Sequence, residues 1–302
     1  MSWTRSSLRH ALAQRGLRPR KGYGQHFLVD PGVCRDLVES GGLPPGADVL
    51  EIGCGPGLLT ERLAPLAGRL VAVDIDPDLA ALCRQTVAGA ANVRVLVRDI
   101  LDDKGRVAVA RGAWSGEEGA SGSGRASLHA PPATEAPPVF VYGNLPYNVS
   151  VDILVAVLAW DVPVARMVAL VQREVAERLI AQPGGEQYGP LSAVAQAFAV
   201  VEVCRRVPPS AFWPPPKVQS AVVRLEPRPA NRSGDALRVW RGLQKLFRGR
   251  RKRLGNVLKS LGIDPDLARE ALRAAGCTAE HRAESLAPEV LSNLTLSLSI
   301  NP

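Results

Sequence analysis

Five short runs of β-branched and other apolar residues limit what this chain can fold into. They lie at 49–52, 70–73, 93–97, 139–142 and 167–171, and amphipathic segments separate most of them. Strands that alternate with helical segments are typical of a parallel sheet joined by crossover helices. The pattern predicts an α/β fold, with a mostly parallel, Rossmann-like sheet and helices on both of its faces.

The amino-acid composition indicates an insertion within the sheet-forming part of the chain and a separate C-terminal segment after it. Residues 112–138 contain nineteen Gly, Ala, Ser or Pro in twenty-seven positions, too little apolar bulk for a packed structure, so we expect a flexible surface insertion. The alternating segment 218–225 predicts a further strand, after which the sequence becomes helical and basic. We therefore predict a sheet-bearing domain at 1–228 and a small all-helical, basic domain at 229–302.

Hydropathy and cysteine usage argue against several classes of protein. The 302 residues contain no uncharged apolar stretch of the roughly 18 residues that a membrane span needs. Five cysteines without a C-x-x-C pair, and four scattered histidines, predict neither a disulfide framework nor a metal site. A cytoplasmic location fits best. The acid-free stretch before Asp30 would also suit a transit peptide, although it continues without a break into folded-looking sequence.

A glycine-rich loop after the first strand indicates a nucleotide-type ligand. Residues 51–57 read E-x-G-x-G-x-G, and glycines there let the backbone approach a ligand at the start of a helix. The dinucleotide fingerprint G-x-G-x-x-G would need glycine at 58, where Leu58 stands. The spacing resembles instead the S-adenosylmethionine loop of class I methyltransferases. A structural turn is the competing interpretation.

Two carboxylates at later strand ends support a nucleoside ligand. Asp74 ends the second strand, where an acid accepts hydrogen bonds from ribose hydroxyls. Asp99 ends the third strand, where a carboxylate accepts one from an adenine amino group. Either acid would also serve as a helix cap. Because open α/β sheets bind ligands at the carboxyl ends of their strands, we expect both acids at one S-adenosylmethionine site.

The turn after the fourth strand, N-L-P-Y at 144–147, carries the residues predicted to act in catalysis. An exocyclic adenine amine is a poor nucleophile, and two hydrogen-bond acceptors favour the pyramidal form that attacks a methyl sulfonium. We expect the side-chain carbonyl of Asn144 and the backbone carbonyl of Leu145 to be those acceptors. Pro146 would hold the turn outward, and Tyr147 would stack on an extruded base. An ordinary Asn-Pro turn is the alternative.

Positive charge is concentrated in one part of the chain. Residues 205–253 include fourteen Lys or Arg against two acids, a balance of +12 in a chain of formal net charge +8. Such a block favours a polyanionic partner, because each neutralised phosphate releases counterions. For the run at 246–259 alone, a solvated charged helix is the alternative.

Together with Y-G-Q-H-F-L-V-D at 23–30, these motifs resemble the ribosomal RNA adenine dimethyltransferases. The segments 170–196, 207–225 and 246–259 are similar to the branch of that family that acts on small-subunit (16S) RNA. The resemblance spans nearly the whole chain apart from the 112–138 insertion. It implies dimethylation of N6 on each of two adjacent adenosines, with S-adenosylmethionine as cofactor and the immature small ribosomal subunit as partner of a monomeric enzyme.

The resemblance also assigns residues by position. Phe212 would form a second aromatic wall opposite Tyr147, with a place in the core as the alternative. Position 26 is often Asn in the family, whereas this chain has His26. A histidine ring nitrogen donates or accepts a hydrogen bond according to its tautomer, so the sequence leaves the contact of His26 open. The implied donor-binding residues are Gln25, His26, Leu28, Gly53, Gly55, Asp74, Ile75, Asp99, Ile100 and Asn144. From the basic run itself, we expect RNA contacts at Arg248, Arg250, Arg251, Lys252 and Arg253.

Two other functions remain open from the sequence. One is methylation of a large-subunit adenine, as in the macrolide-resistance branch, although the basic run and the helical C-terminal segment favour the small-subunit branch. The other is a ribosome-assembly factor that acts mainly by binding. Asn144→Ala separates binding from methyl transfer.

Overall fold

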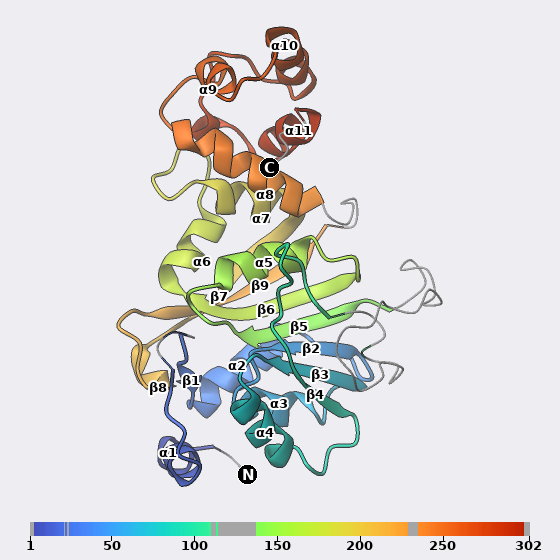
Figure 1. The fold of residues 1–302 in the computed structure, drawn as a ribbon, viewed down its shortest axis with the longest axis vertical. Coiled ribbons are helices and arrows are strands. Elements are labelled where there is room, and N and C mark those ends of the chain that lie inside the picture. Colours follow the sequence, from blue (N-terminus) through green and yellow to red (C-terminus); the bar gives the residue numbers. More distant parts are fainter. Residues whose placement is uncertain are drawn as a thin grey trace.

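A seven-stranded sheet forms the centre of the protein in a computed structural model that describes residues 3–20, 22, 24–109, 113, 137–228 and 235–298. The strand order is β4-β3-β2-β5-β6-β9-β7. The strand β9 runs antiparallel to both β6 and β7, and the other neighbouring pairs are parallel (Figure 1). The strands are β2 (Asp48–Ile52), β3 (Arg69–Asp74), β4 (Val93–Val97), β5 (Val139–Asn144), β6 (Val164–Gln172), β7 (Ala199–Val207) and β9 (Ser220–Pro227). The predicted α/β class is confirmed.

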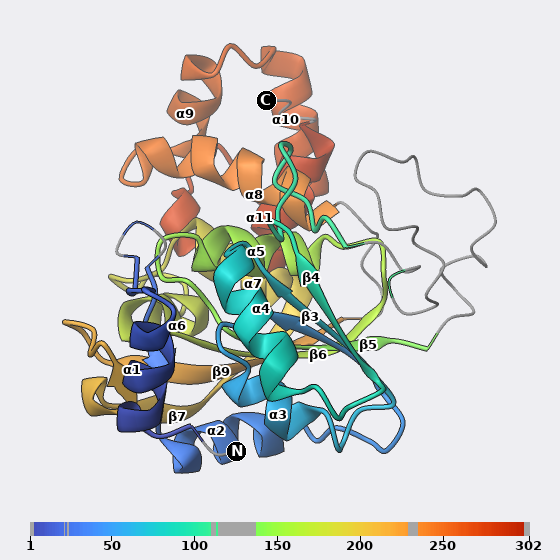
Figure 2. The same cartoon turned by 60° about the horizontal axis from the view of Figure 1, so that its bottom comes forward.

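Both faces of the sheet are covered, which explains why its central strands read as continuous apolar runs. In β6, Met167, Ala169 and Val171 belong to one hydrophobic cluster, while Val168 and Leu170 belong to the other. Helices α2 (Pro31–Ser40), α3 (Leu58–Leu63) and α4 (Pro77–Thr86) cover one face, and Figure 2 shows α4 lying along β3 and β4. Helices α5 (Ser150–Leu158) and α7 (Pro190–Phe198) cover the other, and α6 (Arg173–Ile180) packs beside α7.

The basic N-terminal stretch contains a packed helix, α1 (Arg5–Gln14). Its first turn is capped by Thr4, whose hydroxyl accepts a hydrogen bond from the backbone N–H of Ser7. Leu8 and Leu12 are buried in a cluster with Phe27 and with the side chains that α4 presents. Residues 5–14 are therefore part of the folded protein.

A two-stranded antiparallel ribbon connects the N-terminal segment to the sequence before β9. It pairs β1 (Phe27–Leu28) with β8 (Phe212–Trp213), in the register Phe27↔Trp213 and Leu28↔Phe212. A 3-10 turn, η3 (Pro209–Ala211), leads into β8. Successive side chains of a strand point to opposite faces, so each strand of the ribbon sends one residue to each side.

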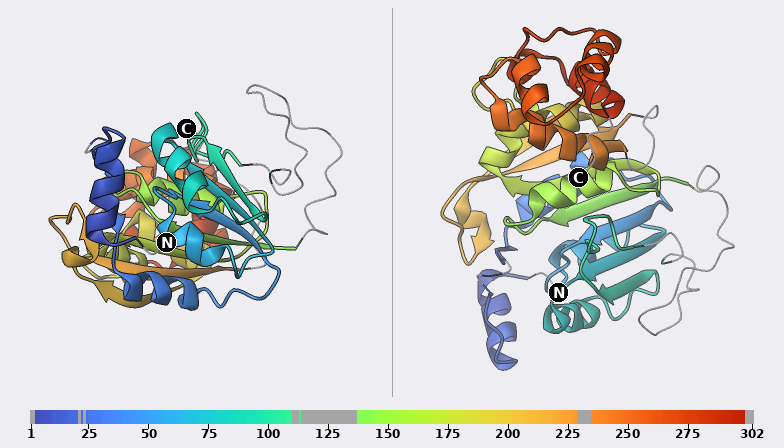
Figure 3. Two further views of the ribbon diagram at one scale, coloured as in Figure 1. Left: turned by 90° about the horizontal axis from the view of Figure 1, so that it is seen from below. Right: turned by 45° about the horizontal axis from the view of Figure 1, so that its top comes forward.

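The C-terminal helices pack onto the sheet-bearing part through one continuous core. Helices α8 (Asp235–Leu246) and α11 (Pro288–Ser297) rest on α7, and α8 also contacts α5 (Figure 3). Helices α9 (Leu254–Ser260) and α10 (Pro265–Ala274) lie beyond them, and the short turns η4 (Phe247–Gly249) and η5 (Ala283–Ser285) connect the group. The predicted all-helical character of this segment is confirmed. The division at 228/229 stays a prediction.

Five of the strands lie where the sequence predicts them, and β9 is shifted by two residues from the predicted 218–225. The sequence reasoning missed β7, because half-exposed polar side chains interrupt its apolar pattern. The predicted insertion at 112–138 lies outside the described residues apart from 113, 137 and 138. None of the described helices has the length and apolar character that a membrane crossing requires.

Candidate functional site

A cavity of about 360 Å³ opens at the carboxyl ends of β2, β3, β4 and β5. Strand ends that point to the same edge bring the glycine loop, the two predicted acids and the N-L-P-Y turn together. Twelve predicted residues line it: Gln25, His26, Gly53, Gly55, Asp74, Ile75, Asp99, Ile100, Asn144, Leu145, Pro146 and Tyr147.

The glycine loop needs glycine for reasons visible in its backbone. Gly53 and Gly57 have φ angles of 72° and 91°, in the left-handed region that other residues rarely adopt. A Cβ on Gly57 would also approach the Sγ of Cys83 to 3.1 Å. The loop therefore lies close against α4 and presents its backbone to the cavity.

Asp74 supports this loop in addition to lining the cavity. Its Oδ2 accepts a hydrogen bond of 2.8 Å from the backbone N–H of Gly55, and its Oδ1 accepts one of 2.9 Å from Asp76. Burial raises the pKa of the Asp74 carboxyl, and these backbone donors oppose that rise. The side chain thus fixes the shape of the loop beside the place where a ribose is expected.

An apolar slot with a polar rim follows the ends of β3 and β4. The side chain of Ile75 is 45% exposed although it is large and aliphatic, and it lines the cavity beside the buried Ile100. The exposed carboxylate of Asp99 lies at the same wall, where its Oδ1 accepts a hydrogen bond from the N–H of Leu101. This combination suits a flat heteroaromatic ring with an exocyclic amine.

Asn144 ends β5 with its amide group oriented by the chain itself. Its Nδ2 donates a 2.7 Å hydrogen bond to the backbone carbonyl of His26. Because that carbonyl can only accept, the NH₂ half of the amide must face it. The Oδ1 of Asn144 is then the half of the amide that remains as an acceptor for a ligand in the cavity.

Tyr147 is held from two sides. Its hydroxyl makes a 2.5 Å hydrogen bond with Ser220 Oγ at the start of β9, and its ring stacks on His26 with centroids 5.4 Å apart. Burial raises the pKa of the Tyr147 phenol, while the hydrogen bond with Ser220 opposes this. The ring therefore stays neutral at physiological pH and presents a fixed aromatic surface.

His26 and Gln25 attach the N-terminal segment to this site. The Nδ1 of His26 lies 2.7 Å from the carbonyl oxygen of Pro214, which can only accept, so Nδ1 carries a proton. In the neutral ring, Nε2 is then the acceptor, which settles the tautomer that the sequence left open. Gln25 accepts a hydrogen bond from the N–H of Arg20 and donates one to Asp76.

Two predicted contact residues, Leu28 and Phe212, do not lie at the cavity in this structure. Leu28 and Phe212 are 5% and 0% exposed and lie in the core cluster on the α2 and α3 side of the sheet. They line neither this cavity nor a second hollow, the groove that adjoins it on the side of α1. They are paired in the β1–β8 ribbon, and alternation sends their neighbours to the opposite side. Phe27 lines the cavity and Trp213 lines the groove, and their rings stack with centroids 6.5 Å apart.

Glu51, the first residue of the glycine motif, does not line the cavity. It is 1% exposed, and its Oε2 has no hydrogen-bond partner among the described residues. Burial raises the pKa of the Glu51 carboxyl well above 4.5, and hydrogen bonds from Thr60 only partly oppose the rise. The described residues contain no group of three or more His, Cys, Asp or Glu that would hold a metal ion.

Comparison with known proteins agrees with this geometry. The family model described as ribosomal RNA adenine dimethylase matches residues 16–297. The chain belongs to that family. It is 36% identical over 288 residues to the ribosomal RNA small subunit methyltransferase A of Moorella thermoacetica, with 94% of each chain covered. The protein of the same name from Rubrobacter xylanophilus is 38% identical, with 92% of this chain and 95% of that one covered.

Solved structures show the same fold. The dimethyladenosine transferase of Plasmodium falciparum superposes with a TM-score of 0.66 at 21% identity, covering 89% of this chain and 96% of that one. The 23S rRNA methyltransferase ErmE gives a TM-score of 0.58 at 26% identity, covering 90% of this chain and 99% of that one. The dimethylase fold therefore extends through the C-terminal helices of this chain.

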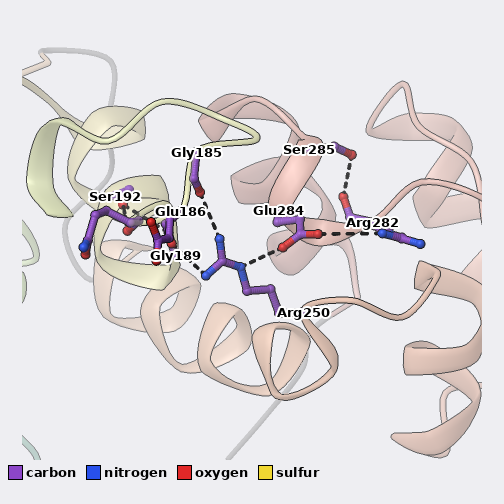
Figure 4. A network of polar contacts seen from close by, with 9 residues as sticks. Gly185, Glu186, Gly189, Ser192, Arg250, Arg282, Glu284 and Ser285 are labelled. Carbon is purple, nitrogen blue, oxygen red and sulfur yellow. Dashed lines mark hydrogen bonds and ion pairs between the residues drawn. The ribbon is translucent and has the colours of Figure 1, made fainter.

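Within this dimethylase, the five predicted RNA contacts divide into two groups. Arg250 is half-buried between the C-terminal helices and the loop that joins α6 to α7 (Figure 4). Its guanidinium donates to the carboxylate of Glu284 at 2.7 Å and to the carbonyls of Gly185 and Glu186 at 2.9 and 2.8 Å. Arg250 thus links two parts of the chain, and its guanidinium is engaged by these three partners, so its predicted contact with RNA stays a prediction.

The other four members of the set are exposed. Arg253 forms an ion pair with Glu280, whereas Arg248, Arg251 and Lys252 form no ion pair with any described residue. The basic block is also less continuous than the sequence suggested, because Arg205 and Arg224 pair with Asp36 and Glu202. The exposed basic side chains of this run that form no ion pair with a described residue are therefore Arg248, Arg251 and Lys252.

Proposed function

We propose that this protein transfers methyl groups from S-adenosylmethionine to N6 of two adjacent adenosines in a small-subunit ribosomal RNA loop, dimethylates each, and so contributes to small-subunit biogenesis. Family membership and the name shared by relatives that are 34–38% identical support this reaction. The single observation that carries the mechanism is the oriented amide of Asn144 at the edge of the cavity.

The residues at the cavity fit S-adenosylmethionine. Gly53 and Gly55 leave room for a ligand along the loop backbone, and Asp74 lies where a ribose would be bound. Ile75 and Ile100 would cover the faces of the adenine ring, and Asp99 would accept a hydrogen bond from its amino group. When bound, S-adenosylmethionine supplies a methyl group on a positively charged sulfur.

The N-L-P-Y turn acts on the target adenine. With its NH₂ held by the His26 carbonyl, Asn144 offers Oδ1 to one hydrogen of the N6 amine, and the backbone carbonyl of Leu145 accepts the other. These bonds draw the nitrogen lone pair out of conjugation, so that it can attack carbon. Tyr147 binds the face of the extruded base. Attack on the methyl carbon would release the sulfur as a neutral thioether and leave N6 positively charged, and this acidic cation would lose its proton without a dedicated base.

A mapping experiment tests this function. The protein is incubated with isotopically labelled S-adenosylmethionine and small subunits that lack the modification, and the RNA is digested and examined by mass spectrometry. We expect labelled N6,N6-dimethyladenosine at two adjacent positions of the small-subunit RNA. Label confined to another base, or absent, would contradict the proposal.

A second candidate is methylation of a large-subunit adenine, which the likeness to ErmE favours. The two candidate functions are distinguished by adding small and large ribosomal subunits to the same reaction and determining which RNA carries the labelled methyl groups. Label on large-subunit RNA alone would establish the second candidate.

The physiological partner proposed here is the immature small subunit, and the protein would act on it as a monomer in the cytoplasm. All five cysteines are free, which fits a reducing compartment. A role in assembly by binding alone remains compatible with the same docking. Pull-down of immature subunits by the methylation-dead Asn144→Ala variant measures that role separately.

A further inference from the structure

A second, larger hollow adjoins the methyl-donor cavity on the side of α1. Its volume is about 970 Å³, near the upper end of the roughly 300–1,000 Å³ that ligand sites enclose. Gly24, Gln25, His26 and Tyr147 line both spaces, so the stacked pair of His26 and Tyr147 stands where they meet. We call this hollow the outer groove.

The lining of the outer groove has the chemistry of a nucleic-acid site. Its described lining residues include no Asp or Glu, whereas Arg9, Arg18 and Lys217 are all present. These three side chains are exposed, and none forms an ion pair with a described residue. By contrast, the nearby Arg20 lies close to Asp76 and Asp78 and does not line the groove.

Trp213 supplies an aromatic surface between these charges. It is only partly buried, and its ring is supported from behind by Phe27 in the β1–β8 ribbon. A proline-rich segment, 214–216, follows it along the wall of the groove. Basic side chains around an aromatic platform are the arrangement by which proteins hold single-stranded nucleic acid without reading its sequence.

The walls of the outer groove are held in place from both sides. The Arg5 guanidinium of α1 donates to the carbonyl of Ser210 at 2.8 Å, which ties α1 to the turn before Trp213. His26 Nδ1 donates to the carbonyl of Pro214 at 2.7 Å, which ties the opposite wall to the catalytic segment. The groove is therefore a formed surface that leads to the N-L-P-Y turn.

We propose that the outer groove holds single-stranded RNA next to the target adenosine, with a neighbouring base stacked on Trp213 and flanking phosphates bound by Arg9, Arg18 and Lys217. This inference rests on the proposed function, because it assigns the strand that leads into the same active site. Figure 1 places α1 and the basic run before α9 at opposite ends of the molecule. The RNA is thus held in two separate areas.

Charge removal tests the phosphate contacts. The probe is a short single-stranded oligoribonucleotide with two adjacent adenosines, titrated at several salt concentrations. Arg9→Gln combined with Arg18→Gln should weaken binding about three- to tenfold and lower the salt slope by about 1 to 1.5. The matched control, Arg15→Gln with Arg84→Gln, removes equal charge from the C-cap of α1 and from α4, outside the groove, and should bind like the wild type.

Fluorescence tests the stacking on Trp213. Binding of the oligoribonucleotide should quench the intrinsic tryptophan emission of the wild type. Trp213→Phe keeps an aromatic face, so it should bind within about twofold of the wild type but lose most of the quenching. Trp213→Leu keeps apolar volume without that face and should bind roughly tenfold more weakly. Equal quenching in wild type and Trp213→Phe would overturn the stacking assignment.

Methylation of small subunits separates this inference from the function on which it rests. If the wild type methylates them and the Arg9 and Arg18 double variant shows an unchanged KM, the groove assignment fails alone. If the wild type methylates no RNA while the double variant still loses oligoribonucleotide binding, the proposed function fails and the groove remains an RNA site. Weaker subunit binding with unchanged oligoribonucleotide binding would show that a ribosomal protein occupies the groove, and would overturn the proposal.

Discussion

The N-L-P-Y turn and the basic run before α9 are both short motifs, but their residues were predictable to different degrees. All four residues of the turn line the cavity where they were expected. In the basic run, Arg250 and Arg251 are neighbours with identical side chains, yet one joins two parts of the core and the other faces solvent. Backbone geometry fixes the turn locally, whereas distant partners decide what each arginine does.

On the turn side, removing the aromatic face of Tyr147 should have a large effect, second to that of Asn144→Ala. Tyr147→Leu should lower kcat/KM for small subunits about 10- to 100-fold, because stacking on one base contributes roughly 1–3 kcal/mol. Tyr147→Phe keeps the face and loses only the hydrogen bond with Ser220, so it should lose less than about tenfold. Equal losses in the two variants would show that the hydroxyl, not the ring, matters.

On the other side of the comparison, Arg251→Gln with Lys252→Gln should affect RNA binding without affecting folding. Both side chains are exposed, so we expect subunit affinity to fall roughly tenfold at physiological salt and the salt slope to decrease by about 2. The measurement is a salt titration of subunit binding. An unchanged slope would place the main phosphate contacts of the C-terminal part elsewhere.

Arg250→Gln should affect the stability of the fold rather than RNA binding. Loss of its bonds to Glu284 and to the carbonyls of Gly185 and Glu186 should lower the free energy of unfolding by about 1–3 kcal/mol, equivalent to roughly 2–5 °C in Tm. Calorimetry of this variant and of Arg251→Gln, which should melt like the wild type, compares the two neighbours directly. A wild-type Tm for Arg250→Gln would remove the distinction between them.

The smallest effect concerns pH and the buried Glu51. Its folded pKa is raised above 4.5, so the native state holds a proton that the unfolded state releases, and stability falls as pH rises through that window. Glu51→Gln removes this penalty and should therefore have a higher Tm than the wild type at pH 7, with no advantage at pH 4. A lower Tm at pH 7 would mean that the carboxylate is charged and bonded in the fold.

The ribbon that joins β1 to β8 shows why part of the site was beyond sequence reasoning. The glycine loop, the acids and the catalytic turn follow from spacing within one strand and its turn. The side to which Leu28 or Phe212 points depends instead on the pairing of two-residue strands far apart in the chain. A shift of one residue exchanges core and cavity, so Phe27 and Trp213 line the spaces that their neighbours Leu28 and Phe212 were expected to line.

Asn144 provides the most direct test of the central claim, which is that an amide oriented by the chain activates the adenine nitrogen. The measurement is the single-turnover rate of methyl transfer to unmodified small subunits, with subunit affinity determined on the same preparation. We predict that Asn144→Ala lowers the rate by at least about 100-fold while affinity stays within about threefold of the wild type. Methyl transfer at the wild-type rate would contradict the account.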